Sequence, residues 1–340
     1  MRLLNFPYLV INEIVKNWDV VERIELSNLS QRIARSIGAT FPSPPFRMTI
    51  GTGKTTTIGL YNNESDEYHS FQWHIGKVEI PKKAKVVRIT KIGETRRKLE
   101  YSVVTYVTPC KKNEQYPLAL DAIMKHLFLI FPRLTVEELN LEGSGNVSYG
   151  LDRGLTAVKR VSDMFIKTEF ATKDVEFLIE NVTVEKSFIS DTVTIMSNRI
   201  LVDKLQCWDF IHVENGKWLS PSKLQNLNCN EVFLSSSKIT HEDFEKFILD
   251  WQTSTGDKYS KVKFISVELQ SNGSRINLQK FGAVPWDANG RTDEFPLSGG
   301  DSMDCSDALS IKREDGTDGA IKDLGNGTIH FFAWPKDAQQ

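Results

Sequence analysis

Cysteine is scarce in this 340-residue sequence, and the four cysteines lie far apart: Cys110, Cys207, Cys229 and Cys305. None belongs to a C-x-x-C pair, so their spacing suggests neither a zinc site nor a disulfide framework. Scattered thiols are typical of a reducing compartment, where disulfides rarely persist. We therefore expect a cytoplasmic or nuclear protein with reduced cysteines.

Long hydrophobic runs are also lacking, and no uninterrupted apolar stretch approaches the length of a membrane span. The sequence places Arg2 before an apolar run, but Asn5 and Pro7 interrupt that run and no small-residue cleavage site follows. The sequence thus predicts neither a signal peptide nor association with a membrane.

An excess of charge of one sign is the third absence. Lys and Arg number 42 against 44 Asp and Glu, which gives a net charge of −2, so no basic field is available to attract nucleic acid. No Gly-x-Ser-x-Gly or H-E-x-x-H motif occurs, and the histidines lack metal-ligand spacing. We expect a chain that is not an enzyme, with no catalytic residue, no cofactor and no metal.

Gly53-Lys54-Thr55 is the one hint of nucleotide binding. A phosphate-binding loop has the pattern G-x-x-x-x-G-K-[ST] between a strand and a helix. Here Met48 occupies the first glycine position, and the residues that follow are β-branched and broken by Gly59, which makes a poor helix. The sequence favours a polar hairpin turn, and nucleotide binding is the lesser alternative.

The first forty residues predict a unit of three short helices. Pro7 suits a first helical turn, and apolar residues then recur every four positions: Val10, Ile14 and Trp18. Asp19 followed by Glu22 has the spacing of a capping box, which predicts a second helix from Val20, and Ser30 is placed to cap a third. Units below about 40 residues usually need a partner to be stable. The helices therefore either form an ordinary cap on a larger domain or present apolar surface to another protein.

The order of motifs in this segment resembles an F-box. The resemblance rests on Leu-x-Phe-Pro-x-Leu-Val at positions 4–10, on Lys16-Asn17-Trp18-Asp19 and on Glu25-Leu26-Ser27-x-x-Ser30-Gln31-Arg32. It implies docking on a Skp-type adaptor, which joins the chain to a cullin-based ubiquitin ligase. The residues expected to dock are Leu4, Pro7, Leu9, Val10, Ile14, Trp18, Leu26 and Ile33.

A β-rich middle region, residues 41–132, is expected to follow the F-box over residues 1–40. Three prolines between Phe41 and Phe46 favour an extended connector. Residues 47–107 alternate apolar and polar side chains between turns, which predicts an antiparallel meander. A helix then begins at Pro117 and is stopped by Pro132.

Beyond residue 132, short strands are expected to alternate with helices over 152–165, 192–202 and 241–251. Thr240 with Asp243 caps the last of these. The spacing of Leu224, Leu227 and Cys229 approaches the rhythm of leucine-rich repeats. Residues 282–305 are expected to form a loop, and Asp-Gly and Asn-Gly dipeptides at 315–316 and 326–327 predict hairpins. The predicted fold class is α+β, with a degenerate leucine-rich-repeat-like array and C-terminal β-hairpins over residues 133–340.

This second half resembles the type-two F-box-associated domain that follows F-boxes in a large family of nematode proteins. The resemblance is carried by Trp218, residues 228–234, Phe247-x-x-x-Trp251 and Ile311-Lys312-Arg313-x-Asp315-Gly316. It implies a region that recruits a target protein. Trp218 is the candidate substrate-binding residue, because it follows a polar turn, whereas Phe210 and Trp251 are expected in the core.

These observations predict a substrate-recognition adaptor of an SCF-type ubiquitin ligase, with a Skp-type adaptor and an unknown target protein as partners. The rival from another class is a ligase-independent protein-binding module. Such a module would bind its target without the first forty residues and would never enter a cullin complex.

Overall fold

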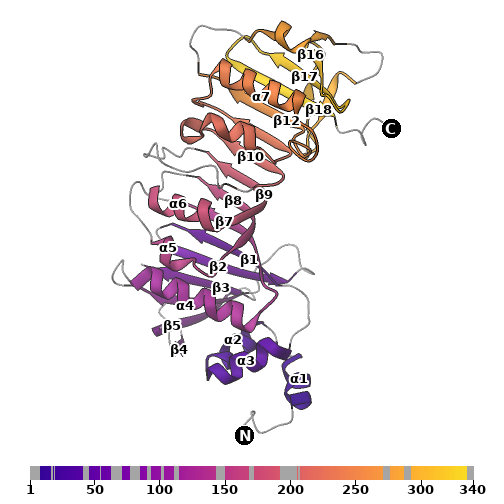
Figure 1. Ribbon diagram of the computed structural model, residues 1–340. Helices are drawn as coiled ribbons and strands as arrows, with labels where there is room; N and C mark the ends of the chain where they lie inside the picture. The colour runs from indigo at the N-terminus through magenta and orange to yellow at the C-terminus, as the bar shows by residue number, and fades with distance from the viewer. Residues whose placement is uncertain are drawn as a thin grey trace. The chain divides into compact units, whose positions relative to one another are not determined.

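The computed structural model describes residues 8–16, 18, 20–40, 46–53, 55–62, 71–76, 85–89, 93–100, 103–110, 115–142, 150–167, 172–191, 205, 207–270, 276–286 and 292–334. The fold is mixed α and β, with a large sheet region and few helices (Figure 1), which is compatible with the predicted α+β class. None of the helices in these ranges is long and apolar enough to cross a membrane. The chain divides into two compact units, unit 1 (Met1–Val182) and unit 2 (Thr183–Gln340).

Unit 1 opens with the helices α1 (Tyr8–Lys16), α2 (Val20–Ser27) and α3 (Gln31–Thr40). The predicted start of the second helix at Val20 is confirmed, and α3 begins directly after Ser30. The side chain of Ser30 accepts a hydrogen bond from the Ile33 N–H at 3.1 Å, which is the expected N-cap. Leu29, Ile33 and Ile37 recur every four residues in the sequence, but Leu29 lies in the turn before α3.

The sheet of unit 1 has the strand order β8-β7-β1-β2-β3-β6-β5-β4. Its strands are β1 (Phe46–Thr52), β2 (Thr55–Asn62), β3 (Phe71–Gly76), β4 (Lys85–Ile89), β5 (Gly93–Glu100), β6 (Val103–Pro109), β7 (Thr135–Leu141) and β8 (Arg160–Ile166). The pairs β1–β2, β2–β3, β4–β5 and β5–β6 are antiparallel. Strands β1–β3 thus form one antiparallel group and β4–β6 another. The two groups join through β3 and β6, which are parallel, so the predicted antiparallel meander is wrong at this point. β7 is also parallel to both β1 and β8.

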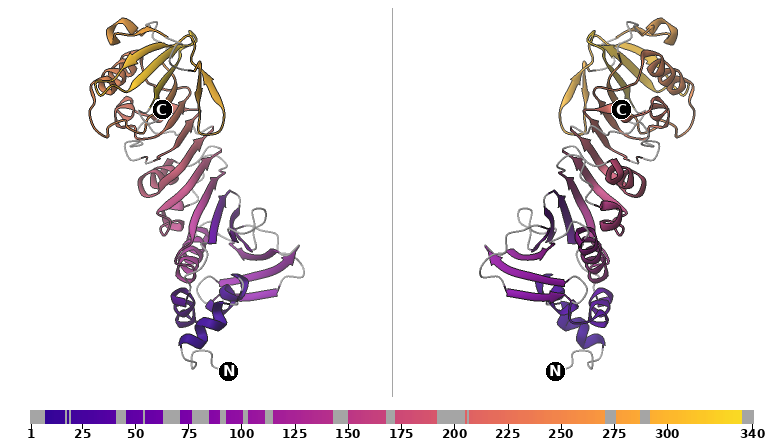
Figure 2. Two further views of the ribbon diagram at one scale, coloured as in Figure 1. Left: turned by 90° about the vertical axis from the view of Figure 1, so that its right-hand side faces the viewer. Right: turned by 90° about the vertical axis from the view of Figure 1, so that its left-hand side faces the viewer.

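Helices cover one face of this sheet (Figures 1 and 2): α4 (Gln115–Ile130), α5 (Leu151–Gly154) and α6 (Thr172–Asn181). The strands bury apolar side chains on one side, as with Val136, Leu139 and Leu141 of β7, and keep polar residues half-buried between them. α4 ends two residues before Pro132, as the sequence predicts.

Unit 2 contains a parallel sheet that is extended by antiparallel strands, in the order β13-β16-β17-β18-β12-β11-β10-β9. The parallel strands are β9 (Thr183–Ser190), β10 (Phe210–Val213), β11 (Glu231–Leu234) and β12 (Phe264–Glu268). The antiparallel strands are β13 (Val284–Pro285), β16 (Leu309–Lys312), β17 (Asp318–Asp323) and β18 (Thr328–Trp334). A separate two-stranded hairpin is formed by β14 (Glu294–Pro296) and β15 (Ser302–Asp304).

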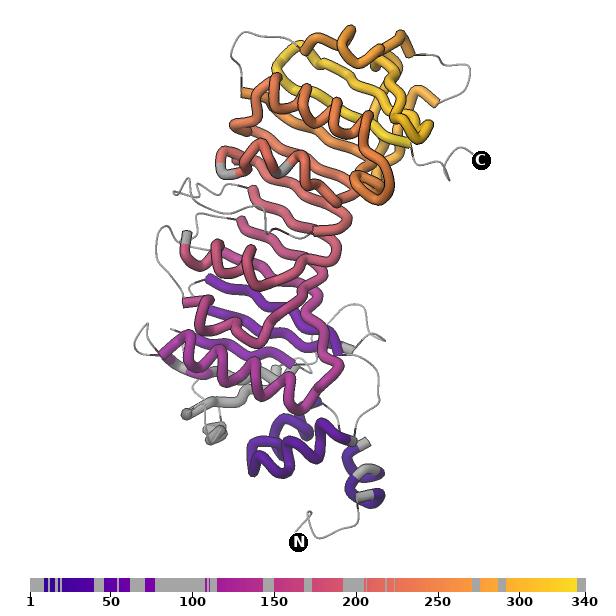
Figure 3. Tube along the Cα trace, in the orientation of Figure 1, coloured from indigo at the N-terminus to yellow at the C-terminus, as the bar shows by residue number. Residues whose placement is uncertain are grey.

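Between the parallel strands the chain returns through helical segments on one face (Figure 3): η3 (Gly216–Trp218), η4 (Pro221–Asn226) and α7 (His241–Thr253). The predicted capping box of α7 is confirmed: the Asp243 N–H donates to Thr240 Oγ1 at 3.2 Å, and the Thr240 N–H donates to Asp243 Oδ2 at 3.1 Å. Trp251 is buried, as predicted, and its ring meets Phe331 of β18 edge-on. A 3-10 turn, η5 (Leu278–Phe281), precedes β13.

The helix predicted over residues 152–165 is wrong. Only the single turn of α5 is helical, and β8 begins at Arg160. The buried residues of β8 are Val161, Met164 and Ile166, and two half-buried residues separate the first two of them. That spacing of three imitates a helical period in the sequence, whereas parallel pairing with β7 forms the strand.

Two further expectations from the sequence have different outcomes. Residues 282–305, predicted as a loop, contain the short strands β13, β14 and β15. The helix predicted over 192–202 lies outside the described residues. The domain boundaries after residues 40 and 132 are boundaries of sequence modules and stay predictions.

Candidate protein-docking surfaces

The three N-terminal helices share a small apolar interior. Its members are exposed by 8% or less: Ile11, Val15, Val20, Val21, Ile24, Ala34 and Ile37. Ile11 and Val15 lie four residues apart on α1, so they form one inward stripe of that helix. The inward stripe is the neighbour of the stripe that contains Val10 and Ile14.

This helical unit rests on α4 through close backbone contact and a hydrogen bond. A Cβ atom at Gly38 of α3 would overlap the carbonyl oxygen of Leu129 in α4, so glycine permits the close approach. Ser27 Oγ lies 2.8 Å from His126 Nε2 and donates to the Ile24 carbonyl at 2.7 Å. Because the hydroxyl proton is used there, Nε2–H of a neutral His126 donates to Ser27. Burial lowers the pKa of His126 to about 4, which favours that neutral form.

The described docking candidates lie outside the buried interior. Leu9 is 74% exposed and Val10 is 40% exposed. Four others are half-buried: Ile14, Trp18, Leu26 and Ile33. Leu4 and Pro7 lie outside the described residues. Leu29, which is 68% exposed, was not among the predicted docking residues, although its place just before the Ser30 cap could have suggested a turn.

Unit 2 offers a second surface on the side of its sheet opposite α7. Phe210 and His212 of β10 and Phe233 of β11 are half-buried there, while Ile211 and Val232 between them are buried on the helix side. The ring centroids of Phe210 and Phe233 are 5.5 Å apart, and those of His212 and Phe233 are 6.0 Å apart. We call Phe210, His212 and Phe233 the aromatic row.

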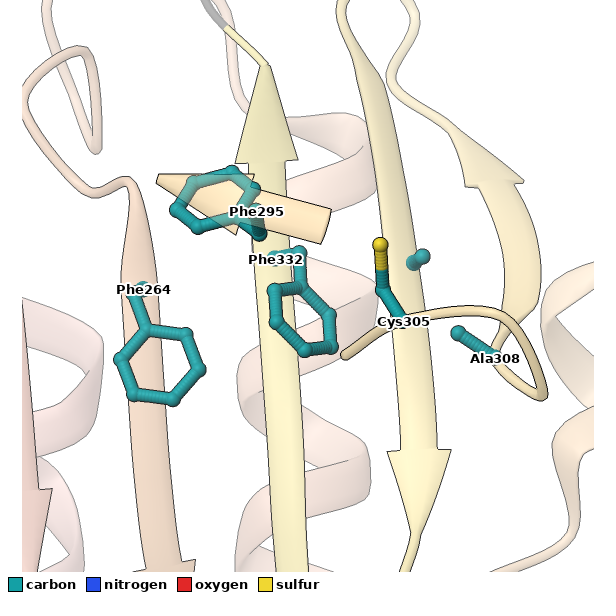
Figure 4. Close-up of a cluster of buried hydrophobic side chains, with 6 residues drawn as sticks. Phe264, Phe295, Cys305, Ala308 and Phe332 are labelled. Carbon is teal, nitrogen blue, oxygen red and sulfur yellow. The ribbon is translucent and has the colours of Figure 1, made fainter. Parts of the chain in front are cut away.

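The row continues into a closed cluster over β12 and β18 (Figure 4). The ring centroids of Phe233 and Phe264 are 5.1 Å apart. Phe264 in turn packs with Phe332 and with Phe295 of β14. Phe295 is 3% exposed, so the β14–β15 hairpin covers this part of the face and leaves the aromatic row more open. Sequence reasoning placed Phe210 in the core and did not separate the two faces, although the alternation of Phe210 and His212 with Ile211 and Val213 carries that signal.

Trp218 and Trp208 offer less evidence for a binding surface than the aromatic row does. Trp218 is in η3, but its side chain lies outside the described residues, so its predicted role in substrate binding stays a prediction. Trp208 is 40% exposed, and Lys261 Nζ lies 5.2 Å from its ring centroid. That cation–π contact occupies one face of the exposed ring.

The structure argues against a nucleotide site. β1 and β2 are antiparallel neighbours, with Gly51 opposite Thr57, so the segment after β1 leads into strand β2 and not into a helix. A phosphate loop requires the N–H donors of a helix N-terminus. Lys54 itself lies outside the described residues. Within the described ranges, no group of three or more His, Cys, Asp or Glu side chains could hold a metal ion.

Comparisons with known proteins include a distant relative of this chain. No family model matches the chain, and no solved structure matches it. The uncharacterized protein F59B2.9 of Caenorhabditis elegans is 21% identical over 337 residues, which cover 93% of this chain and 73% of the relative. The similarity extends over nearly the whole chain, but the name of the relative states no activity.

Proposed function

We propose that this protein is a non-catalytic substrate-recognition adaptor of a cullin-based, SCF-type ubiquitin ligase. Its helices α1–α3 dock on a Skp-type adaptor, and unit 2 binds the target protein. Holding the target close to the catalytic subunits promotes ubiquitin transfer, because proximity replaces a bimolecular encounter. We also propose that α1–α3 form an F-box and that the strand–helix array is leucine-rich-repeat-like.

The observation that carries the proposal is the exposure of Leu9 and Val10 on α1. Large apolar side chains are exposed side by side on a helix whose neighbouring stripe, Ile11 and Val15, is buried. Exposed apolar surface of this kind is typical of protein–protein contact. The half-buried Ile14 and Trp18 continue the Val10 stripe at four-residue spacing.

The experiment that tests the proposal compares two matched double variants. In Leu9→Glu with Val10→Glu, two charges replace the exposed pair, and we expect binding to a purified Skp-type adaptor to fall at least tenfold by calorimetry. The control, Leu118→Glu with Leu249→Glu, alters leucines of α4 and α7 that are 64% and 44% exposed. It should bind as the unaltered chain does. If the two variants bind the Skp-type adaptor equally well, α1 is not part of the interface.

The ligase-independent binding module is the second candidate, and the aromatic row supports it because aromatic side chains dominate binding hot spots. Removal of residues 1–40 would not separate the candidates cleanly. It would strip α3 from α4, where Gly38 packs against Leu129, and so disturb unit 1. The Leu9→Glu, Val10→Glu variant is the better tool: an SCF adaptor loses the Skp-type partner but keeps its target.

A further inference from the structure

The β14–β15 hairpin of unit 2 is fastened to the rest of the unit at two separate places. At its base, Lys322 Nζ lies 2.7 Å from Asp304 Oδ2 and also donates to the Asp304 carbonyl at 3.1 Å. At its tip, the backbone N–H and the hydroxyl of Ser298 both donate to Glu231 Oε1, each at 2.6 Å. The polar contacts given for the tip thus join one carboxylate to one serine.

The two residues at the tip differ sharply in burial. Glu231 is 2% exposed, whereas Ser298 and the following Gly299 are exposed. A Cβ atom at Gly299 or Gly300 would meet nothing within 4 Å, so the turn projects into open space. Because Ser298 is exposed on this turn, its hydroxyl has only to rotate away from Glu231 to meet an enzyme.

We propose that Ser298 is a phosphorylation site and that its modification releases the tip of the β14–β15 hairpin from Glu231. Ser298 Oγ attacks the γ-phosphorus of ATP; the new Oγ–P bond replaces the bond to ADP, and the hydroxyl proton passes to the base of the kinase. Asp301, three residues after Ser298, is an acidic residue at the position that acid-directed serine kinases recognise.

Release follows from charge. The phosphate carries about −2 at neutral pH and supplies only acceptors, so Glu231 loses the hydroxyl donor of Ser298 and keeps only its backbone N–H. Two anions then face each other where one of them is buried, and the repulsion is barely screened there. The contacts at the base do not involve Ser298, so the tip moves and the base stays.

The part of the face that the tip covers adjoins the aromatic row. Leu297, next to Ser298, and Phe233 both pack against the closed cluster around Phe264. Displacement of Leu297 removes one of the side chains that pack against this cluster beside the aromatic row. The idea that release of the tip regulates target binding rests on the proposed function. The release itself is a property of the isolated chain.

Hydrogen exchange followed by mass spectrometry tests the release on the full chain alone. Ser298→Glu should raise the exchange rate of the amides in 295–303 at least tenfold. The matched control is Ser302→Glu, because Ser302 Oγ donates at 3.0 Å to the carboxylate of Glu294, which is exposed. That variant adds the same charge to the same hairpin and should leave exchange unchanged. Equal exchange in the two variants would overturn the proposal.

A rescue variant and the modification itself complete the test. Glu231→Gln, combined with Ser298→Glu, removes the repulsion and should restore protection; continued fast exchange would contradict the charge mechanism. Treatment with ATP and an acid-directed serine kinase should place a phosphate on Ser298 and reproduce the exchange pattern, and no phosphate at Ser298 would refute the site. Neither result depends on the Skp-type adaptor, so failure here and failure of α1 docking are distinguishable.

Discussion

Single buried polar residues hold the ends of elements in place, and Arg313 is the clearest case. It is 5% exposed, and its guanidinium donates to the carbonyls of Ser254 and Lys258 at 3.0 and 2.7 Å, which fastens the loop after α7. Arg313→Met keeps the apolar stem but removes these donors, so we expect a loss of about 2–3 kcal/mol in the free energy of unfolding. Urea titration measures it.

The neighbouring Lys312 supplies the control for this change. Its side chain is 74% exposed and its ammonium lies 3.9 Å from Asp318. Lys312→Met should alter stability by less than about 0.5 kcal/mol. Equal losses in the two variants would mean that the buried guanidinium is not the anchor of this loop.

His126 makes the stability of unit 1 depend on pH. Burial lowers its pKa to about 4, below the ordinary 6.5. As pH falls from about 6.5 to about 4, the unfolded chain binds a proton that folded His126 does not, so stability decreases in this window. Burial lowers the pKa of His74 and His330 as well, with the same sign.

For His126 we therefore predict a difference in the pH dependence of stability between the original chain and a His126 variant. Between about pH 7 and about pH 4.5, the original chain should lose about 2 kcal/mol more stability than His126→Gln, after allowance for its half-buried position. Urea titrations at the two pH values measure the difference. Parallel losses would show that His126 is protonated in the folded protein.

At the scale of elements, the contact between α3 and α4 depends on one glycine. Gly38→Ala should force the helices apart at the Leu129 carbonyl, at a cost of about 2 kcal/mol. Gly299→Ala is the matched control, since nothing lies within 4 Å of the added atom, and it should be neutral within about 0.5 kcal/mol. Thermal unfolding compares the two. A neutral Gly38→Ala would mean that α3 does not rest on α4.

Elements with local signals could be predicted from the sequence, and elements that depend on pairing could not. α7 was found because Thr240 and Asp243 cap it and its apolar face repeats regularly. β8 was mistaken for a helix because two half-buried residues interrupt its alternation. The hydrogen bonds that form it come from β7, a separate strand about 25 residues earlier in the chain.

At the scale of the whole molecule, the sequence predicted which classes of element occur but not how distant segments meet. The parallel pairing of β3 with β6 has no local signature. Neither has the contact of Ser298 with Glu231, which lies 67 residues earlier in the chain. For the docking surface, helical periodicity indicated the α1 residues, but their division into the buried Ile11 and Val15 and the exposed Leu9 and Val10 required the packing of all the helices.

The proposed function assigns two surfaces to one chain. The exposed Leu9 and Val10 of α1, which we call the α1 ridge, would bind the ligase, and the aromatic row in unit 2 would bind the target. The account therefore depends on recruitment, and above all on whether the α1 ridge reaches a Skp-type partner.

Affinity purification from the native source, followed by mass spectrometry, tests this most directly. We expect the unaltered chain to recover a Skp-type adaptor and a cullin together with a target protein. The Leu9→Glu, Val10→Glu variant should recover the target but neither ligase subunit. Recovery of a target with no Skp-type adaptor or cullin by the unaltered chain would contradict it.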